Sequence, residues 1–491
     1  MPSTEIDKEE VSHAEDGPTP VPSFTEAEGK RVRRKADFVL LPMFCAIYAL
    51  GFLDKTALTY ASVMGIRTAA KLTVGQYAWL GSIYFFGYLV GCYPMAIGHQ
   101  RFPAAKFTSA TIILWGATTM STAACSTYPQ LMGVRFLLGF LEATITPATV
   151  MFTAEWYNKS EQATRVGIWG SFSTWGGILG AGVAYGLSMR EVEARWGNSG
   201  TVMAIASWKA IFIFLGGLTI LIGLLFLFLV PDTIDGARFL SPREKEVAKL
   251  RTLENKQHIA ETHWKWYQVR EALLDPAVWL LCMIIVLSFI PNGGITNFYA
   301  IIVLGMGFTV QETLLLSMAN AWLSIGLIVT FWTADKIRCR SLAGIPLTIV
   351  SIIGATMVWA LPRNQKIARL AGFYLSLAFA IPTFVAMTFL TSNIAGRTKK
   401  TFVTGMILVF NCTGNLIGPQ TFRDKDGPVY APALLTFVIC NAINLVLLVT
   451  MFFYYRWQNA KRDRLYGKPV ADEDHFVDLT DGENKSFRYV L

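Results

Sequence analysis

Apolar stretches of roughly twenty residues recur along the whole of this 491-residue chain. Each is long enough to cross a hydrocarbon core of about 30 Å as an α-helix. Hydrophobic residues make up 53% of the chain and charged residues only 16%, which excludes an ordinary soluble domain. The stretches lie at residues 38–60, 76–98, 107–126, 130–153, 166–187, 208–230, 277–303, 312–333, 343–361, 369–391, 401–421 and 432–455. The sequence therefore predicts an all-α membrane protein with twelve transmembrane helices in two six-helix halves.

Basic residues beside these stretches indicate how the chain is oriented. They gather before the first stretch, in two later loops and after the last stretch. The clearest groups are Lys30 to Lys35, Arg338 with Arg340, Arg397 to Lys400, and Arg456 to Arg464. Because Lys and Arg are retained on the cytoplasmic side, both termini are predicted to be cytoplasmic, which requires an even number of spans. This distribution accounts for the net charge of +9 without a nucleic-acid partner. We expect a monomer in the plasma membrane.

A long charged segment divides the spans into six and six. We expect a disordered cytoplasmic tail at residues 1–35, an N-terminal half at 36–230 and a cytoplasmic linker at 231–274. A C-terminal half follows at 275–456 and a cytoplasmic tail at 457–491. The polar stretch after Tyr466 is also predicted to be disordered, because it cannot bury enough apolar surface to fold.

Four ionisable residues lie deep within the predicted spans, all in the N-terminal half: Asp54, Lys55, Arg135 and Glu142. A charge at the centre of a membrane helix costs at least about 2.5–3.5 kcal/mol, so such residues usually face a cavity or a partner. Arg135 and Glu142 are seven residues apart and share one helix face. An arginine there can bind a carboxylate with a fork of donors, and a buried glutamate can carry a proton. The alternative is an internal ion pair that locks the fourth span against the first.

Asp54 and Lys55 are adjacent, so they diverge by about 100° around a helix. One can face the cavity while the other pairs with a neighbouring span. Asp54 is the second candidate for a proton-coupling carboxylate and Lys55 a candidate for charge pairing; a purely structural pairing of Asp54 is the alternative. None of the five histidines lies deep in a span, which leaves Asp54 and Glu142 as the candidate proton carriers.

Polar and helix-weakening residues mark the C-terminal half. Pro291 to Gly294 are predicted to interrupt the seventh span, and Gly414 to Pro419 the eleventh, because unwound backbone is tolerated where it lines a cavity. The candidate substrate contacts are Asn292, Asn297, Asn411 and Asn415. The alternative is that these asparagines join helix to helix. The scattered cysteines form no disulfide or metal-binding pattern.

Several segments resemble known transporters. Ala334-Asp335-Lys336-Ile337-Arg338-Cys339-Arg340 is similar to a cytoplasmic loop motif of the major facilitator superfamily, which implies a gating role for Asp335 and Arg338. Other segments resemble the fungal allantoate permease family, of the anion:cation symporter group, over about residues 36–460. They are Phe52-Leu53-Asp54-Lys55, Gln76-Tyr77-Ala78-Trp79, Arg135-Phe136-Leu137-Leu138-Gly139, Asn292-Gly293-Gly294-Ile295-Thr296-Asn297, Asn393-Ile394-Ala395-Gly396-Arg397 and Gly414-Asn415-Leu416-Ile417-Gly418-Pro419.

This resemblance implies a secondary transporter rather than an enzyme, with a proton gradient in place of a cofactor. It implies proton-coupled uptake of a small carboxylate similar to allantoate, nicotinate or pantothenate. It also assigns carboxylate binding to Arg135 and proton coupling to Glu142. The alternative is a proton-antiport exporter of a secondary metabolite or toxin. Such antiporters usually carry a Gly-Pro dipeptide in the fifth span, which is absent from Ser173-Thr174-Trp175-Gly176-Gly177.

Overall fold

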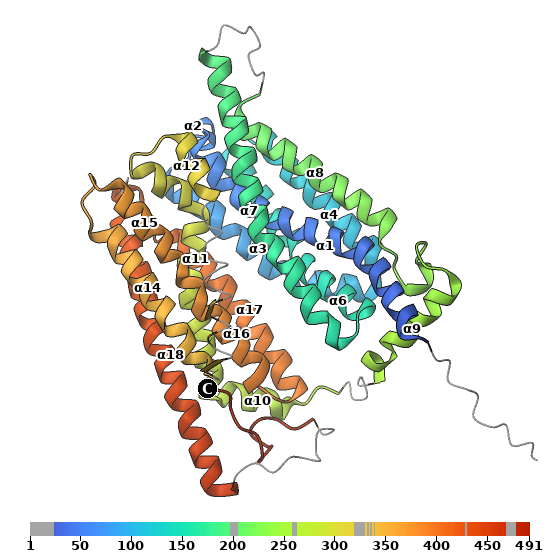
Figure 1. Ribbon diagram of the computed structural model, residues 1–491. Helices are drawn as coiled ribbons and strands as arrows, with labels where there is room; N and C mark the ends of the chain where they lie inside the picture. Colours follow the sequence, from blue (N-terminus) through green and yellow to red (C-terminus); the bar gives the residue numbers. More distant parts are fainter. Residues whose placement is uncertain are drawn as a thin grey trace, which may run out of the picture.

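The computed structural model describes residues 24–196, 205–257, 263–318, 329–330, 333, 336–337, 339–427, 430–467 and 478–491. Regular structure in these ranges is helical (Figure 1). The long helices of the first half are α1 (Glu26–Val63), α3 (Val74–Arg101), α4 (Ala104–Ser121), α5 (Tyr128–Glu142) followed by α6 (Ile145–Trp156), α7 (Lys159–Trp196) and α8 (Ser207–Leu229). Those of the second half are α11 (Pro276–Gly305), α14 (Arg340–Ala360), α15 (Lys366–Ser376) followed by α16 (Ile381–Asn393), α17 (Arg397–Gln420) and α18 (Ala431–Tyr466).

These helices match the predicted spans closely. Within the described ranges, nine helices or consecutive helix pairs are long and apolar enough to cross a membrane. Two further long helices pack against these spanning helices: α4 packs against α8, and α7 packs against α1. The eighth predicted span begins with α12 (Val310–Leu316) and otherwise lies largely outside the described residues. Large apolar side chains such as Phe38, Phe228 and Phe453 are more than half exposed on the outside, where lipid covers them.

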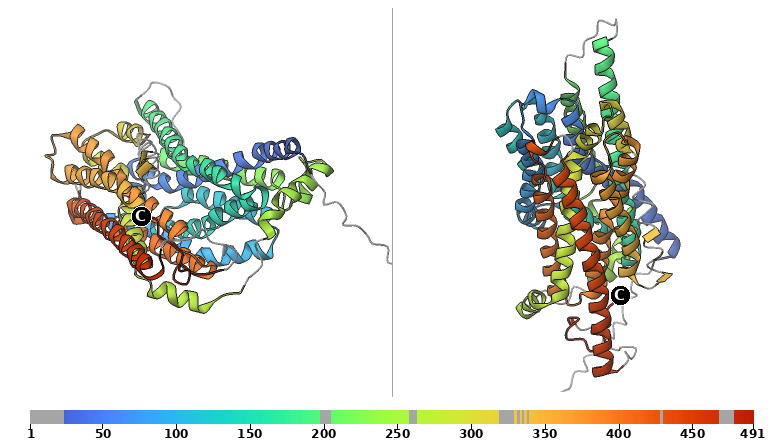
Figure 2. Two further views of the ribbon diagram at one scale, coloured as in Figure 1. Left: turned by 60° about the horizontal axis from the view of Figure 1, so that its bottom comes forward. Right: turned by 90° about the vertical axis from the view of Figure 1, so that its left-hand side faces the viewer.

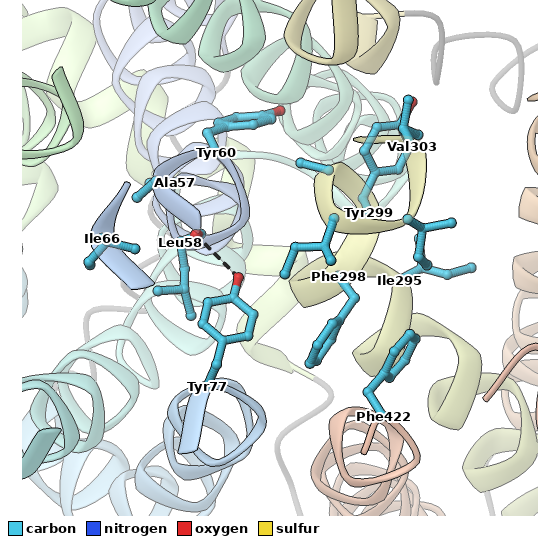
Figure 3. Packing of buried hydrophobic residues seen from close by; sticks show 14 of the residues in the cluster. Ala57, Leu58, Tyr60, Ile66, Tyr77, Ile295, Phe298, Tyr299, Val303 and Phe422 are labelled. Atoms are coloured by element: carbon cyan, nitrogen blue, oxygen red, sulfur yellow. Dashed lines mark hydrogen bonds between the residues drawn. The ribbon is translucent and has the colours of Figure 1, made fainter. Parts of the chain in front are cut away.

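The two halves meet at one end of the bundle. We call this the distal end, because the described chain termini lie at the other, terminal end (Figures 1 and 2). One apolar cluster draws residues from both halves, including Tyr77 of α3, Phe298 of α11 and Phe422 after α17. Phe298 stacks on Phe422 with ring centroids 4.0 Å apart, and the Tyr77 hydroxyl shares its proton between a longer contact to the Leu58 carbonyl, 3.3 Å, and a shorter one to the Asn297 carbonyl (Figure 3). Two further clusters, each within one half, form the cores near the terminal end.

The linker between the halves contains two helices that dock on different halves. Helix α9 (Pro242–Gln257) binds the first half, where Lys35 pairs with Glu244 at 2.8 Å and Arg251 with Glu161 at 2.7 Å. Hydrogen bonds from the Lys35 ammonium and the Ser241 backbone amide hold the pKa of Glu244 below its usual range. Helix α10 (Trp266–Leu274) instead contacts α17 in the second half.

Both tails are more ordered than the sequence predicted. Helix α1 begins at Glu26 with a Thr25–Glu28 capping box, so the expectation of disorder is wrong for residues 26–35. At the other end, Asp481 pairs with Lys399 at 2.8 Å, and the ring of Tyr489 stacks on Tyr455. The expectation of disorder after Tyr466 is therefore wrong for residues 478–491, because charge pairing is combined with packing of Tyr489 and Leu491 against the core of the second half.

The predicted interruptions of the seventh and eleventh spans are wrong. Helix α11 continues through Pro291 and α17 continues from Arg397 to Gln420. The glycines serve close packing instead. A Cβ atom on Gly293 would lie 2.6 Å from the Asn415 carbonyl oxygen, and one on Gly418 would collide with the Ile290 carbonyl. Small residues let two membrane helices approach this closely without unwinding.

Candidate functional site

Three of the four predicted charged residues are almost fully buried. Asp54 and Arg135 are each 3% exposed and Glu142 is 4% exposed, whereas the Lys55 side chain is 32% exposed. Lys55 of α1 places its Nζ atom 2.7 Å from Glu142 Oε1 of α5. The other glutamate oxygen, Oε2, has no hydrogen-bond partner. An ion pair therefore does join the first and fourth spans, but it uses Lys55 and Glu142.

Asp54 has a different partner, Trp115. Its Oδ2 atom accepts a hydrogen bond of 3.0 Å from the indole Nε1–H of Trp115 on α4, and its Oδ1 atom has no partner. Sequence reasoning missed Trp115, which is 1% exposed. The available signal was that a buried tryptophan usually needs an acceptor for its N–H.

Arg135 has a different environment from the other buried charges. Its Nε and Nη2 atoms have no hydrogen-bond partner, and no carboxylate of the described residues lies within salt-bridge distance, although Asp54 and Glu142 interact with its charge at longer range. Arg135 lines a gap of about 10 Å³ between the halves, together with Lys55, Tyr84, Thr296 and Asn297. Because these two buried donor atoms have no acceptor, Arg135 has unused capacity to bind an anion.

The four asparagines form two arrangements in the second half. Asn292 Nδ2 donates to Asn415 Oδ1 at 2.8 Å, and Asn415 Nδ2 donates to Asn411 Oδ1 at 2.9 Å. Asn297 instead donates to the Gly293 carbonyl of its own helix at 2.8 Å. The bond from Asn292 to Asn415 joins α11 to α17, as the packing alternative expected, whereas the other two bonds lie within a single helix. Asn292 and Asn297 also line cavities between the halves, so they remain candidates for substrate contact.

A larger cavity of about 290 Å³ lies beside the Arg135 gap. Thr296 lines both, so α11 is the wall that they share. The lining of the larger cavity comes from both halves and contains hydroxyl groups, an amide and aromatic rings but no charged side chain. Its main polar and aromatic members are Phe52, Thr56, Tyr60, Thr174, Asn292 and Tyr299.

Hydrogen bonds between the halves close the distal side of these cavities. The Tyr77 hydroxyl donates to the Asn297 carbonyl at 2.7 Å, and Gln420 donates to the Ser82 hydroxyl at 2.9 Å. Asp424 accepts from the Val74 backbone amide at 2.6 Å. The predicted gating residues Asp335 and Arg338 lie outside the described residues. Within the described ranges, no three His, Cys, Asp or Glu side chains lie close enough to hold a metal ion.

Comparison with known proteins identifies the family. The family model for the Major Facilitator Superfamily matches residues 44–419. The chain belongs to the major facilitator superfamily. It is therefore a membrane-embedded transporter rather than an enzyme, and the predicted all-α fold is confirmed.

Two curated relatives of this major facilitator cover nearly its whole length. It is 34% identical over 484 residues to the allantoate permease of Saccharomyces cerevisiae, covering 95% of this chain and 87% of the relative. It is 35% identical over 468 residues to an uncharacterized transporter of Schizosaccharomyces pombe, covering 94% and 89%. The resemblance to fungal allantoate permease stated from the sequence is thus confirmed.

A solved structure supports the major facilitator fold. The bacterial homologue of the human lysosomal transporter Spinster, in an inward-facing and occupied conformation, aligns with a TM-score of 0.62 at 18% identity. The alignment covers 85% of this chain and 96% of the bacterial protein. At this identity the likeness concerns the fold alone.

Proposed function

We propose that this major facilitator takes up a small organic anion together with protons. The observation that carries the proposal is the buried Arg135 guanidinium, whose Nε and Nη2 atoms have no partner beside a gap between the two halves. A planar guanidinium matches a carboxylate in a two-point, charge-assisted contact. The allantoate permease relative supports a carboxylate of that kind.

The larger cavity suits the remainder of such a substrate. Its volume of about 290 Å³ fits a small molecule, and its hydroxyl and amide groups can bind amide or ureide groups of the substrate. A carboxylate reaching past Thr296 would approach Arg135. Asn292 and Asn297 are the proposed substrate contacts of the second half, with Asn411 and Asn415 supporting Asn292 through their hydrogen bonds.

Proton coupling is proposed for Glu142, with Asp54 as the second carboxylate. Protonation of Glu142 would neutralise its ion pair with Lys55 and release the ammonium toward the Arg135 gap. The cavity would then gain a positive charge as the proton binds, which favours binding of an anion. This order of events would link proton binding to substrate binding.

The predicted topology places the closed side of the cavities outside the cell. With both termini in the cytoplasm, the distal end faces outward and is closed in this structure by bonds such as that from Tyr77 to Asn297. We propose that the chain works as a monomer in the plasma membrane. Asp335 and Arg338 are proposed to act in the gate on the cytoplasmic side.

Matched pairs of substrates test this proposal. Uptake would be measured in yeast lacking its own permeases, with nicotinate against nicotinamide, pantothenate against pantothenol, and allantoate against allantoin. We expect accumulation of at least one acid, faster at acidic outside pH, with no accumulation of its neutral partner. Equal uptake of acid and neutral partner, or efflux without uptake, would contradict the proposal.

A further inference from the structure

Helix α10 exposes an apolar face although it lies outside the spans. Trp266 is 75% exposed, Leu274 71%, Tyr267 50% and Leu273 44%. Helical spacing puts these four side chains on one side of α10, which we call the outer face. The residues on its opposite side, Gln268, Val269 and Ala272, are buried. The helix is therefore amphipathic with its larger apolar side chains turned away from the protein.

The buried side of α10 fixes this orientation. The Gln268 side-chain oxygen accepts hydrogen bonds of 3.1 Å from the backbone amides of Thr398 and Lys399 at the start of α17. Glu271 pairs with the buried Lys399 ammonium at 3.0 Å. Because these contacts hold α10 against α17, the helix cannot turn its outer face inward.

The outer face continues the lipid-facing surface of α11. Leu273, Leu274 and Pro276 form one groove with Trp279 and Met283 of that spanning helix, whose side chains are both 43% exposed. Helix α10 lies across the terminal end of the bundle, where α11 begins (Figures 1 and 2). Lipid that covers Trp279 and Met283 therefore also reaches the outer face of α10.

Residue types on α10 match the boundary between acyl chains and headgroups. Tryptophan and tyrosine concentrate at that depth, and Trp264, two residues before the helix begins, is 48% exposed as well. Arg270 is exposed between Trp266 and Leu274 on the outer face. A cation among apolar side chains at that depth suits an anionic headgroup.

We propose that α10 is an interfacial helix that binds the membrane leaflet nearest the chain termini. Its outer face enters the boundary between acyl chains and headgroups, and Arg270 contacts an anionic headgroup. Gln268 joins α10 to the start of α17, a helix that contacts α3 of the other half. This assignment concerns lipid and does not depend on the transported substrate.

Measuring depth tests the position of α10. Single cysteines would replace Trp266 and Leu274 in the full-length protein in phosphatidylcholine–phosphatidylserine vesicles, in a background without the native cysteines. A third cysteine would replace Glu246 on α9, whose side chain is 50% exposed. We expect spin labels at 266 and 274 to collide more with oxygen than with a water-soluble nickel complex, and the label at 246 to do the reverse. Equal access of the nickel complex to all three labels would overturn the interfacial placement.

Lipid-dependent stability tests the headgroup contact. Phosphatidylserine added to phosphatidylcholine should raise the Tm of the native protein, and Arg270→Gln should remove about half or more of that shift. Arg363→Gln, at an exposed arginine of the distal end, should retain it. A full phosphatidylserine shift in Arg270→Gln would overturn the role of Arg270.

Discussion

Individual buried charges differ in how they are neutralised, and this difference is the basis of the proposed mechanism. Asp54 has an indole donor and Glu142 has the Lys55 ammonium, whereas Arg135 has two donor atoms without an acceptor and only longer-range interactions with Asp54 and Glu142. Their rarity in apolar spans made all four charged residues predictable from sequence. Their partners were not predictable, because which side chains meet across α1, α4 and α5 depends on helix rotation and depth. Trp115 shows this most clearly.

We predict that Arg135→Lys weakens transport although the charge is kept. The ammonium loses the two-point geometry of the guanidinium, so the KM for the substrate should rise about tenfold, equivalent to about 1.4 kcal/mol. The measurement is concentration-dependent uptake at equal surface expression. An unchanged KM would show that Arg135 does not bind the carboxylate.

Trp115→Phe is predicted to alter the pH profile of uptake. The change keeps an aromatic ring but removes the donor to Asp54, leaving a buried carboxylate without a partner. Trp156→Phe is the matched control, because Trp156 is 3% exposed and its indole N–H has no partner. We expect a displaced profile only for Trp115→Phe. Identical profiles for the two variants would assign Trp115 to packing alone.

At the scale of whole helices, local sequence patterns gave a wrong prediction for α11 and α17. Glycine and proline in α11 and α17 suggested unwound segments, yet both helices are continuous. Such residues weaken an isolated helix, but in a membrane the close contact between two helices stabilises them. Close packing along the seam, the contact between α11 and α17, depends on which glycine of one helix faces which backbone atoms of the other. A single sequence does not show these pairs.

Gly418→Ala is predicted to destabilise the transporter. Its new methyl group would collide with the Ile290 carbonyl across the seam. Gly405→Ala on the same helix is the control, since a Cβ atom there meets nothing within 4 Å. Thermal unfolding in detergent should show a lower Tm for the first variant and no loss for the second. A Tm equal to that of the native protein in Gly418→Ala would refute the close-packing explanation.

Asp424→Asn is predicted to loosen the distal closure. Asp424 accepts from Val74 and Gly75 at the start of α3, which belongs to the other half. Losing the charge weakens the interaction of this side chain with the N-terminus of α3 by up to about 1 kcal/mol. The distal end should therefore open more often. A cysteine that replaces Ser173 in the larger cavity should then react about fivefold faster with an impermeant maleimide added outside the cell.

Asp232→Asn provides the control for this measurement. Asp232, at the beginning of the linker, accepts from Ala105 and Lys106 at the start of α4, so this contact does not join the two halves. Its replacement removes the same kind of contact without touching the boundary between the halves. Equal labelling rates in the two variants would mean that Asp424 does not hold the distal end closed.

At the scale of the whole molecule, composition and basic flanks predicted the all-α membrane fold, and the family match confirms that fold. The docking of residues 478–491 was not predictable. Lys399 binds Glu271 and Asp275, which lie four residues apart, and Asp481. Both groups are far from Lys399 in the sequence. A polar segment with few apolar residues appears disordered in sequence until its charged partners are known. The order of residues 478–491 was therefore missed because it depends on ion pairs between residues far apart in the sequence.

The central claim is that one buried glutamate couples protons to uptake of an anion, and Glu142→Gln tests it most directly. The amide cannot titrate and cannot form the ion pair with Lys55. The measurement is accumulation of a transported acid at acidic and neutral outside pH, with counterflow and surface expression in parallel. We predict that Glu142→Gln loses pH-driven accumulation and keeps counterflow. Retained pH-driven accumulation in this variant would contradict the claim.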